Sequence, residues 1–203
     1  MNREEYNRIK DLNYREYCKY LQDKYGLPPM NYMTEKGNRY SKNNRAADDG
    51  LMIHHLYEDH NIKLSERGRA LKRPYEWQRK ENLLYCDCLE RLYLHYLICI
   101  DPSDYAKENN IQVGLNDIIM ELVPKLNDAY SGYLPTVDFR KRQRDLIIED
   151  KDVYLEILKL IKERYVGRIP HFMNIYLFTS YNERYRVWKR EYNQDLFDEI
   201  AKL

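Results

Sequence analysis

The chain has 203 residues, of which 43% are hydrophobic and 33% charged, and its 7 Gly and 7 Pro are too few for a disordered chain. This length suits one domain, or one small domain with a helical extension. The net charge of +1 excludes attraction to nucleic acid by an overall field, and no apolar run approaches the roughly 20 residues of a membrane span.

The chain begins with a predicted amphipathic helix. Over residues 2–24 apolar side chains recur at intervals of about three and four residues, and the sequence GLPP at 26–29 ends this pattern. The N-terminal stretch has no apolar signal-peptide core. The polar segment that follows is expected to hold one short strand at 39–41. A second short strand is predicted over residues 51–56, LMIHHL, after a turn signal.

The rest of the chain is predicted to be a basic loop followed by helices. The loop covers residues 61–80 and is expected to contain a short helical turn, and a helix begins at about Asn82 and stops at Asp101-Pro102. Further helices are expected at 115–130, with a kink at Pro124, at 152–165 and at about 182–201, whereas the apolar run at 173–178 fits no single type. The predicted fold class is therefore α+β and mostly α.

The four cysteines indicate a cytoplasmic protein. Cys18, Cys86, Cys88 and Cys99 show no paired spacing, so reduced thiols are expected. Zinc binding by Cys86, Cys88 and His95 is only weakly indicated, because a second pair of cysteines is missing.

A group of histidines and one asparagine is the most specific feature of the sequence. His54 and His55 end the second predicted strand, where neighbouring side chains point to opposite faces. Asn82 is a favoured residue type for the N-cap of the helix that follows. Arg91 and His95 lie four residues apart, so they are expected on one face of that helix.

This order of residues resembles the HNH, or ββα-metal, endonucleases of phages and mobile elements. The resemblance implies that His55 is the general base, His54 and His95 are metal ligands, and Asn82 is the amide that orients the base. It also implies a divalent metal, Mg²⁺ or Mn²⁺, and DNA as the substrate. The implied segments are an N-terminal helix (1–35), an HNH-like ββα core (36–101) and a C-terminal helical region (102–203).

One position departs from the family pattern. Nine residues after Asn82, where the family has a metal ligand, this chain has Arg91, which stays charged and offers only hydrogen-bond donors. An active site would need a ligand from Glu58, Asp59 or His60, or coordination completed by phosphate and water, or Arg91 as a phosphate clamp. Alternatively, only an inactive scaffold remains.

Basic residues in three segments are candidates for contact with nucleic acid or an acidic partner, although each segment also fits an ordinary solvated surface. The segments are the basic loop, the cluster near 140–144 and the final helix, where basic side chains surround aromatic rings. The candidate residues are Arg69, Lys72, Arg73, Arg79, Lys80, Arg140, Arg142, Arg186 and Trp188.

Three functional hypotheses follow, and each predicts a different arrangement. An active HNH-like endonuclease requires His54, His55 and His95 to converge with a further ligand nearby. An inactive HNH-like scaffold, acting as an inhibitor of a host defence nuclease as anti-CRISPR proteins do, predicts Arg91 in the place of the ion, paired with an acidic residue. A helical interaction domain, in which the histidines are coincidental, predicts His95 far from the strand.

Overall fold

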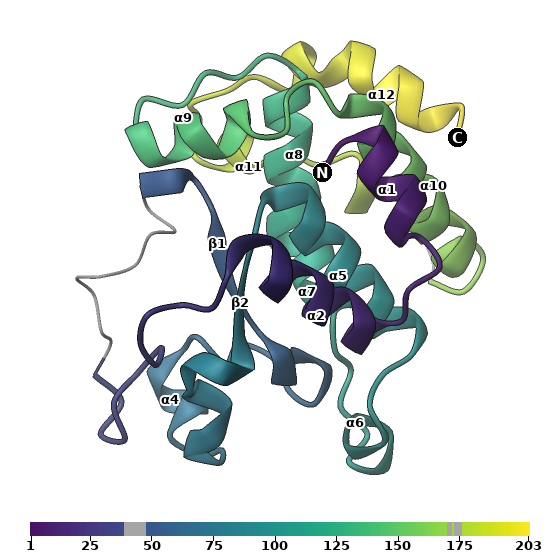
Figure 1. Cartoon of the computed structure of the whole chain (residues 1–203). Helices are drawn as coiled ribbons and strands as arrows, with labels where there is room; N and C mark the ends of the chain where they lie inside the picture. Colours follow the sequence, from purple (N-terminus) through teal and green to yellow (C-terminus); the bar gives the residue numbers. More distant parts are fainter. Residues whose placement is uncertain (39–47, 170–171, 173–175) are drawn as a thin grey trace.

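The computed structural model describes residues 1–38, 48–169, 172 and 176–203, and the described chain is mostly helical with one small antiparallel sheet (Figure 1). The predicted α+β, mostly α fold class is confirmed. No helix in these residues is long and apolar enough to cross a membrane.

The helices and strands follow one another from the N-terminus as short elements joined by tight turns. The helices are α1 (Arg3–Ile9), α2 (Tyr14–Tyr25), α4 (Arg67–Ala70), α5 (Cys88–Ile100), α6 (Asp104–Glu108), α7 (Leu115–Asp117), α8 (Val123–Tyr130), α9 (Asp138–Asp145), α10 (Lys151–Tyr165), α11 (Tyr181–Arg184) and α12 (Gln194–Ala201). The strands are β1 (Met52–His55) and β2 (Leu83–Cys86), and 3₁₀ turns cover Leu56–Asp59, Tyr75–Gln78, Lys80–Asn82 and Arg190–Asn193.

The sheet is a hairpin with a long connection. β1 and β2 pair antiparallel, with His54 opposite Leu84 and His55 opposite Leu83. The prediction that a helix begins at Asn82 is wrong, because the next four residues form β2. A short apolar run buried on both faces has no period that separates a strand from a helix. The predicted strand at 39–41 lies outside the described residues.

The helix after β2, α5, begins at Cys88, and Asp87 is its N-cap. The Asp87 side chain accepts from the backbone N–H of Glu90 at 2.7 Å, and the Glu90 carboxylate accepts from the N–H of Asp87 at 2.7 Å. This reciprocal capping box satisfies two donors that the first helical turn would leave unpaired. It fixes where α5 starts, and therefore which turn of α5 carries His95.

Two predicted helices are divided. The helix expected over 2–24 is wrong as one element, because Asn13 and Glu16 form a capping box that starts α2 separately from α1. The helix expected at about 182–201 is also wrong as one element. Arg186 has a φ of 57°, which a continuous right-handed helix does not allow, so α11 and α12 are separate.

Helix 115–130 is present but irregular: a π turn at Ile118–Leu122 joins α7 to α8, and Pro124 lies in the first turn of α8. The basic loop contains α4 and a 3₁₀ turn, as predicted. The helices α6 and α9 were not predicted.

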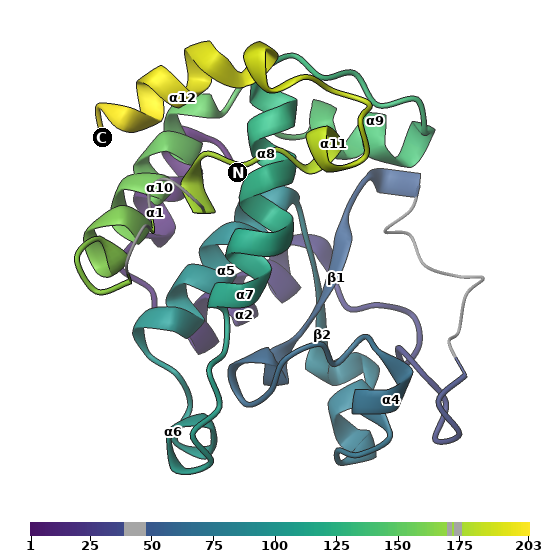
Figure 2. The same ribbon diagram turned by 180° about the vertical axis from the view of Figure 1, so that it is seen from behind.

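The main hydrophobic core is arranged around α5. α5 contacts α2 and β2 on one side and α10 and the π turn on the other, and α12 runs across one end of this group (Figures 1 and 2). One core cluster contains side chains from the N-terminal helix α1, from the C-terminal helix α12 and from elements between them, so it joins all three predicted segments. The boundaries of these segments stay a prediction. Its fully buried members include Leu21, Leu84, Leu92, Leu94, Ile98, Ile157 and Ile161.

Candidate metal centre

The end of β1, the turn after it and the middle of α5 bring three potential metal ligands together. β1 supplies His54, the 3₁₀ turn supplies Glu58, and α5 supplies His95; all are buried, with at most 4% of each residue exposed. Their candidate ligand atoms all lie within 4.8 Å of one another, and the rings of His54 and His95 are 5.2 Å apart. The expectation that His95 lies far from the strand is therefore wrong.

Within this group, named the His54–Glu58–His95 cluster, the Glu58 carboxylate lies about as far from each imidazole as two ligands of one small ion lie from each other. Glu58 Oε2 lies 3.4 Å from His54 Nδ1 and 3.3 Å from His95 Nε2. Two ligand atoms of a tetrahedral zinc site, each about 2.0–2.1 Å from the metal, are about 3.3 Å apart. His54 Nδ1 and His95 Nε2 make no hydrogen bond to any described residue.

The Tyr14 hydroxyl contacts the far side of His54. It lies 2.9 Å from His54 Nε2 and 3.1 Å from the carbonyl oxygen of Leu56. In the tautomer in which His54 Nε2–H donates to this hydroxyl and the hydroxyl donates to Leu56, Nδ1 of His54 holds a lone pair 3.4 Å from Glu58 Oε2. Two acceptors that face each other repel unless a cation lies between them.

His95 is supported from its other side by α7. Gly114 has a φ of 81°, and a Cβ there would lie 2.6 Å from the carbonyl oxygen of His95, so glycine lets the start of α7 approach α5 closely. This approach brings Asp117 Oδ2 to 3.8 Å from His95 Nδ1. At this distance Asp117 makes no hydrogen bond to His95 Nδ1, which has no hydrogen-bond partner among the described residues, so the carboxylate acts on the ring only as a nearby negative charge.

His55 faces a different wall of the site. The Gln78 amide donates to the carbonyl oxygen of Leu64 at 3.1 Å, so its oxygen faces His55 and accepts from Nε2–H at 3.3 Å. His55 Nδ1 is left without a hydrogen-bond partner among the described residues and lies 3.5 Å from Glu58 Oε1. An unprotonated nitrogen in this position can accept a proton.

Asn82, the amide expected to orient His55, lies elsewhere. Its side chain donates to the carbonyl oxygen of Glu76 at 2.8 Å and holds the turn before β2. The amide in contact with His55 is that of Gln78. The sequence does not point to Tyr14, Gln78 or Asp117, because no local pattern distinguishes these residues from others of their type.

Arg91 borders the cluster one turn before His95. Its guanidinium donates to the carbonyl oxygen of Ile53 at 3.2 Å and lies 3.8 Å from Glu58 Oε2. Both imidazole nitrogens are closer to that oxygen than Arg91 is. Of Glu58, Asp59 and His60, the three residues named as possible replacements for the missing ligand, Glu58 is the one that lies beside both histidines.

Electrostatics favour the protonation states that a metal ligand requires. Burial lowers the pKa of His54 well below its usual range. Burial alone would raise the pKa of Glu58, but neighbouring positive charge, including the Arg91 guanidinium 3.8 Å away, outweighs burial and holds that pKa well below its usual range. A neutral imidazole and an ionised carboxylate are the forms that bind a cation.

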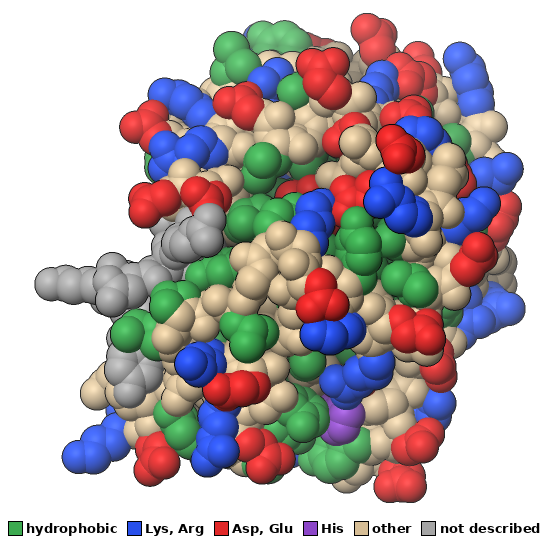
Figure 3. Space-filling model, in the orientation of Figure 1, with side chains coloured by type: hydrophobic (Ala, Val, Ile, Leu, Met, Phe, Trp, Pro, Cys, Tyr) green, Lys and Arg blue, Asp and Glu red, His purple; other side chains and the backbone are tan. Residues whose placement is uncertain are grey.

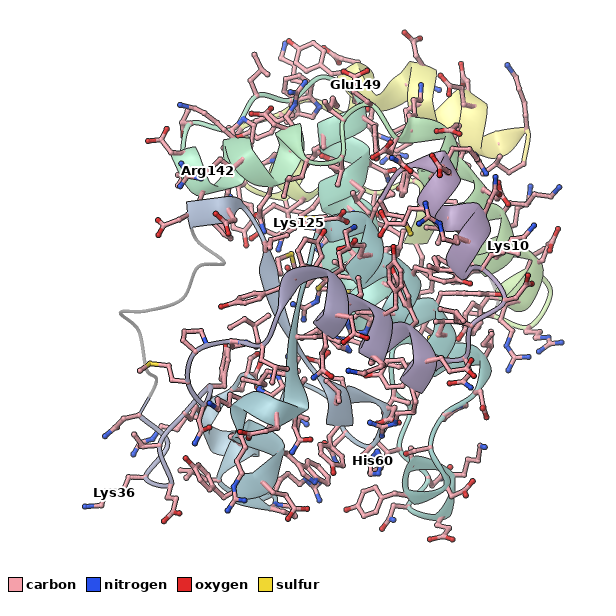
Figure 4. The ribbon with its side chains drawn as sticks, in the orientation of Figure 1. Lys10, Lys36, His60, Lys125, Arg142 and Glu149 are labelled. Carbon is pink, nitrogen blue, oxygen red and sulfur yellow. The ribbon has the colours of Figure 1, made fainter. Side chains whose placement is uncertain are left out.

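Asp59 and His60 lie outside this cluster. The Asp59 carboxylate binds Arg15 at 2.7 Å and His60 Nδ1 at 2.6 Å. Figure 4 labels His60 at the edge of the molecule, where Figure 3 shows a small surface area of histidine. Neither residue is therefore available as a ligand at the His54–Glu58–His95 cluster.

The basic residues predicted to bind nucleic acid do not form one patch. On the face in Figure 3, acidic and basic side chains are mixed throughout. Arg69, Lys72, Arg79, Lys80, Arg140, Arg142 and Arg186 are exposed, and Arg73 is partly buried with its guanidinium on the Tyr105 hydroxyl. Trp188 is partly buried and packs against Tyr133 and Tyr192, so its ring is not an open stacking surface.

Comparison with known proteins gives no relative: no family model, no curated protein and no solved structure matches this chain.

Proposed function

We propose that this protein is a metal-dependent phosphodiesterase that cleaves DNA, with an HNH-like ββα centre. The observation that carries the proposal is the pair of buried imidazole nitrogens, His54 Nδ1 and His95 Nε2, that face one carboxylate oxygen at 3.4 and 3.3 Å with no hydrogen bond. The order of strand, strand and helix, with ligands from the first strand and the helix, agrees with the resemblance.

Each side chain has a distinct role in this proposal. A divalent cation would be held by His54, Glu58 and His95, and it would supply the Lewis acid that takes up charge on the phosphate oxygens. His55 Nδ1 accepts the proton of the attacking water, and Gln78 keeps that nitrogen unprotonated by accepting from Nε2–H. Arg91 binds a phosphate oxygen through its guanidinium.

The ligand types favour a transition metal over magnesium. Mg²⁺ prefers oxygen ligands in an octahedral arrangement, whereas two imidazoles and one carboxylate suit Zn²⁺, Mn²⁺, Co²⁺ or Ni²⁺. Of the two ions expected from sequence, Mn²⁺ therefore fits better than Mg²⁺.

Metal binding is the first test. Zn²⁺, Mn²⁺ and Mg²⁺ are titrated calorimetrically into the chelator-treated full-length protein. We expect one equivalent of Zn²⁺ or Mn²⁺ to bind. Glu58→Gln or His95→Gln should weaken this affinity by more than about 100-fold, because loss of a direct metal ligand costs more affinity than the roughly 10–100-fold lost with a residue that only hydrogen-bonds to a ligand. His60→Gln removes a histidine outside the cluster and should bind as the wild type does. A folded wild type that binds none of these ions would overturn the proposal.

Catalysis is tested separately by the nicking of supercoiled plasmid DNA with each metal. His55→Ala should still bind metal, which shows that it is folded, but should lose nicking because the proton acceptor is gone. If His55→Ala nicks at the wild-type rate, His55 is not the base.

A second candidate function is a catalytically inactive scaffold that inhibits a host defence nuclease. Two observations favour it: Arg91 lies 3.8 Å from Glu58, where an ion would compete with it, and the side chains of His54, His55 and His95 are almost fully buried. This candidate predicts no nicking with any metal. It also predicts that Arg91→His, which restores the ligand type of the family at that position, increases metal affinity.

A further inference from the structure

A cavity separate from the His54–Glu58–His95 cluster lies between β1, α8 and α9. Its volume is about 580 Å³, which falls within the range of about 300–1,000 Å³ typical of small-molecule sites. Gly50, where φ is 75°, lies at the close contact between the chain that enters β1 and helix α9. A Cβ at this residue would lie 2.8 Å from the backbone of Arg142 in α9. Glycine therefore lets the chain entering β1 pack directly on α9, and the cavity is already formed.

The cavity has an unusual distribution of charge. Four of the side chains that line it are cationic, and none of the described residues that line it is acidic. These cations are Arg91, Lys125, Arg140 and Arg144. The whole chain has a net charge of only +1, so this is a local concentration of positive charge rather than a general property of the surface.

Acidic residues outside the cavity lie near three of these cations. Arg91 lies 3.8 Å from the buried Glu58 carboxylate, Lys125 pairs with Glu121 at 2.6 Å and Arg144 pairs with Asp145 at 3.4 Å; Glu121 and Asp145 are exposed to solvent. Arg140 has no ion pair within the part of the chain that the structure describes, and its guanidinium lies 5.9 Å from the centre of the Tyr181 ring. Lys125, labelled in Figure 4 between α8 and β1, lies 4.8 Å from the same ring.

Aromatic rings and amides make up much of the remaining lining. Tyr133 and Phe139 offer ring faces or edges against which a flat ligand can stack, and Gln143 and Asn182 offer amide groups. The Asn182 amide nitrogen already donates to Asp128 at 2.9 Å, so its oxygen remains as an acceptor. Cations beside stacking surfaces match a ligand that combines negative charge with a flat heterocycle.

We propose that this cavity binds a nucleotide, with its phosphate at Arg140 and Lys125 and its base on the aromatic wall. Arg91 also lines the cavity and lies 3.8 Å from Glu58, so the cavity and the His54–Glu58–His95 cluster share this residue as a neighbour. Binding itself needs no metal and does not depend on the proposed phosphodiesterase activity.

The test is calorimetric binding of adenosine 5′-monophosphate and of adenosine to the full-length protein with a chelator present. The monophosphate should bind at least about tenfold more tightly than adenosine, because hydrogen bonds to a charged phosphate add affinity. Arg140→Gln should remove most of this difference and leave adenosine binding unchanged. Equal binding of the two compounds, or no binding of the monophosphate at millimolar concentration, would overturn the proposal.

Lys141→Gln is the matched control, because Lys141 is exposed on the same helix, pairs with Asp138 at 2.9 Å and does not line the cavity. If it weakens binding as much as Arg140→Gln does, the effect is general electrostatics and the cavity is not the site. Competition with a short single-stranded oligonucleotide then identifies the source of the ligand. Displacement at concentrations below that of the monophosphate indicates a nucleotide within a strand, and no displacement indicates a free nucleotide.

Discussion

At the scale of single residues, the candidate metal centre depends on side chains that hold others in place. Gln78 donates to the carbonyl oxygen of Leu64, so its amide oxygen accepts from His55 and determines the tautomer of that ring, and the Tyr14 hydroxyl contacts His54 at 2.9 Å. His54 and His55 are consecutive in the sequence but are oriented from different parts of the chain. The chemistry available to each histidine is therefore decided by residues far away in sequence.

A prediction at this scale separates the two amides. Gln78→Ala leaves His55 Nε2–H and the carbonyl oxygen of Leu64 unpaired in the interior, so we expect the free energy of unfolding to fall by about 1–3 kcal/mol. The ¹⁵N chemical shifts of the His55 ring should change from one tautomer to a mixture. Asn82→Ala should leave these shifts unchanged, because its amide binds Glu76. If Asn82→Ala changes the ¹⁵N shifts of the His55 ring and Gln78→Ala does not, Asn82 is the residue that orients His55.

At the scale of secondary structure, capping residues place the ligands. Asp87 and Glu90 fix the start of α5, and Asn13 and Glu16 fix the start of α2, whose first residue is Tyr14. The 3₁₀ turn that follows β1 reverses the chain within four residues, so Glu58 comes back to His54. The positions of His95, Tyr14 and Glu58 are therefore fixed by where these short elements begin and end.

The Asn13 cap provides the prediction at this scale. Asn13→Ala removes an acceptor for the first turn of α2 and should lower the free energy of unfolding by about 1 kcal/mol in urea denaturation. Asn13→Ser retains a capping oxygen and should lie within a few tenths of a kcal/mol of the wild type. If serine and alanine cost the same, the cap does not stabilise α2.

At the scale of the whole molecule, burial of neutral His54 makes stability depend on pH. The pKa of His54 in the folded chain is well below 6.5, so as the pH falls below about 6.5 the unfolded chain takes up a proton that the folded chain does not. The free energy of unfolding should therefore fall, by at most about 1.4 kcal/mol per pH unit. Glu58, whose pKa is also lowered, adds to this loss once the pH falls below about 4.5.

Glu90 acts in the opposite direction, because burial and the neighbouring Asp87 raise its pKa to about 7. The measurement is therefore a comparison of the wild type with His54→Gln in urea at pH 7.5 and pH 5.5, with a chelator present. The wild type should lose more stability between these values than the variant does. Equal losses would show that His54 is not the group responsible.

The sequence by itself determined the mostly helical α+β class, the strand that carries His54 and His55, and the helical face shared by Arg91 and His95, because local periodicity and spacing fix these features. It did not determine β2, since a short apolar run has no distinguishing period, nor the breaks within the first and last helices. Only the tertiary structure brought Glu58, of three neighbouring candidates, to the two histidines, placed Gln78 and not Asn82 beside His55, and placed Tyr14 near His54 and Asp117 near His95. It also formed the basic cavity, whose walls come from β1 and from α8 and α9, two helices that begin more than 60 residues after β1 along the chain. Contacts of this kind depend on packing between distant elements, and no local pattern encodes them.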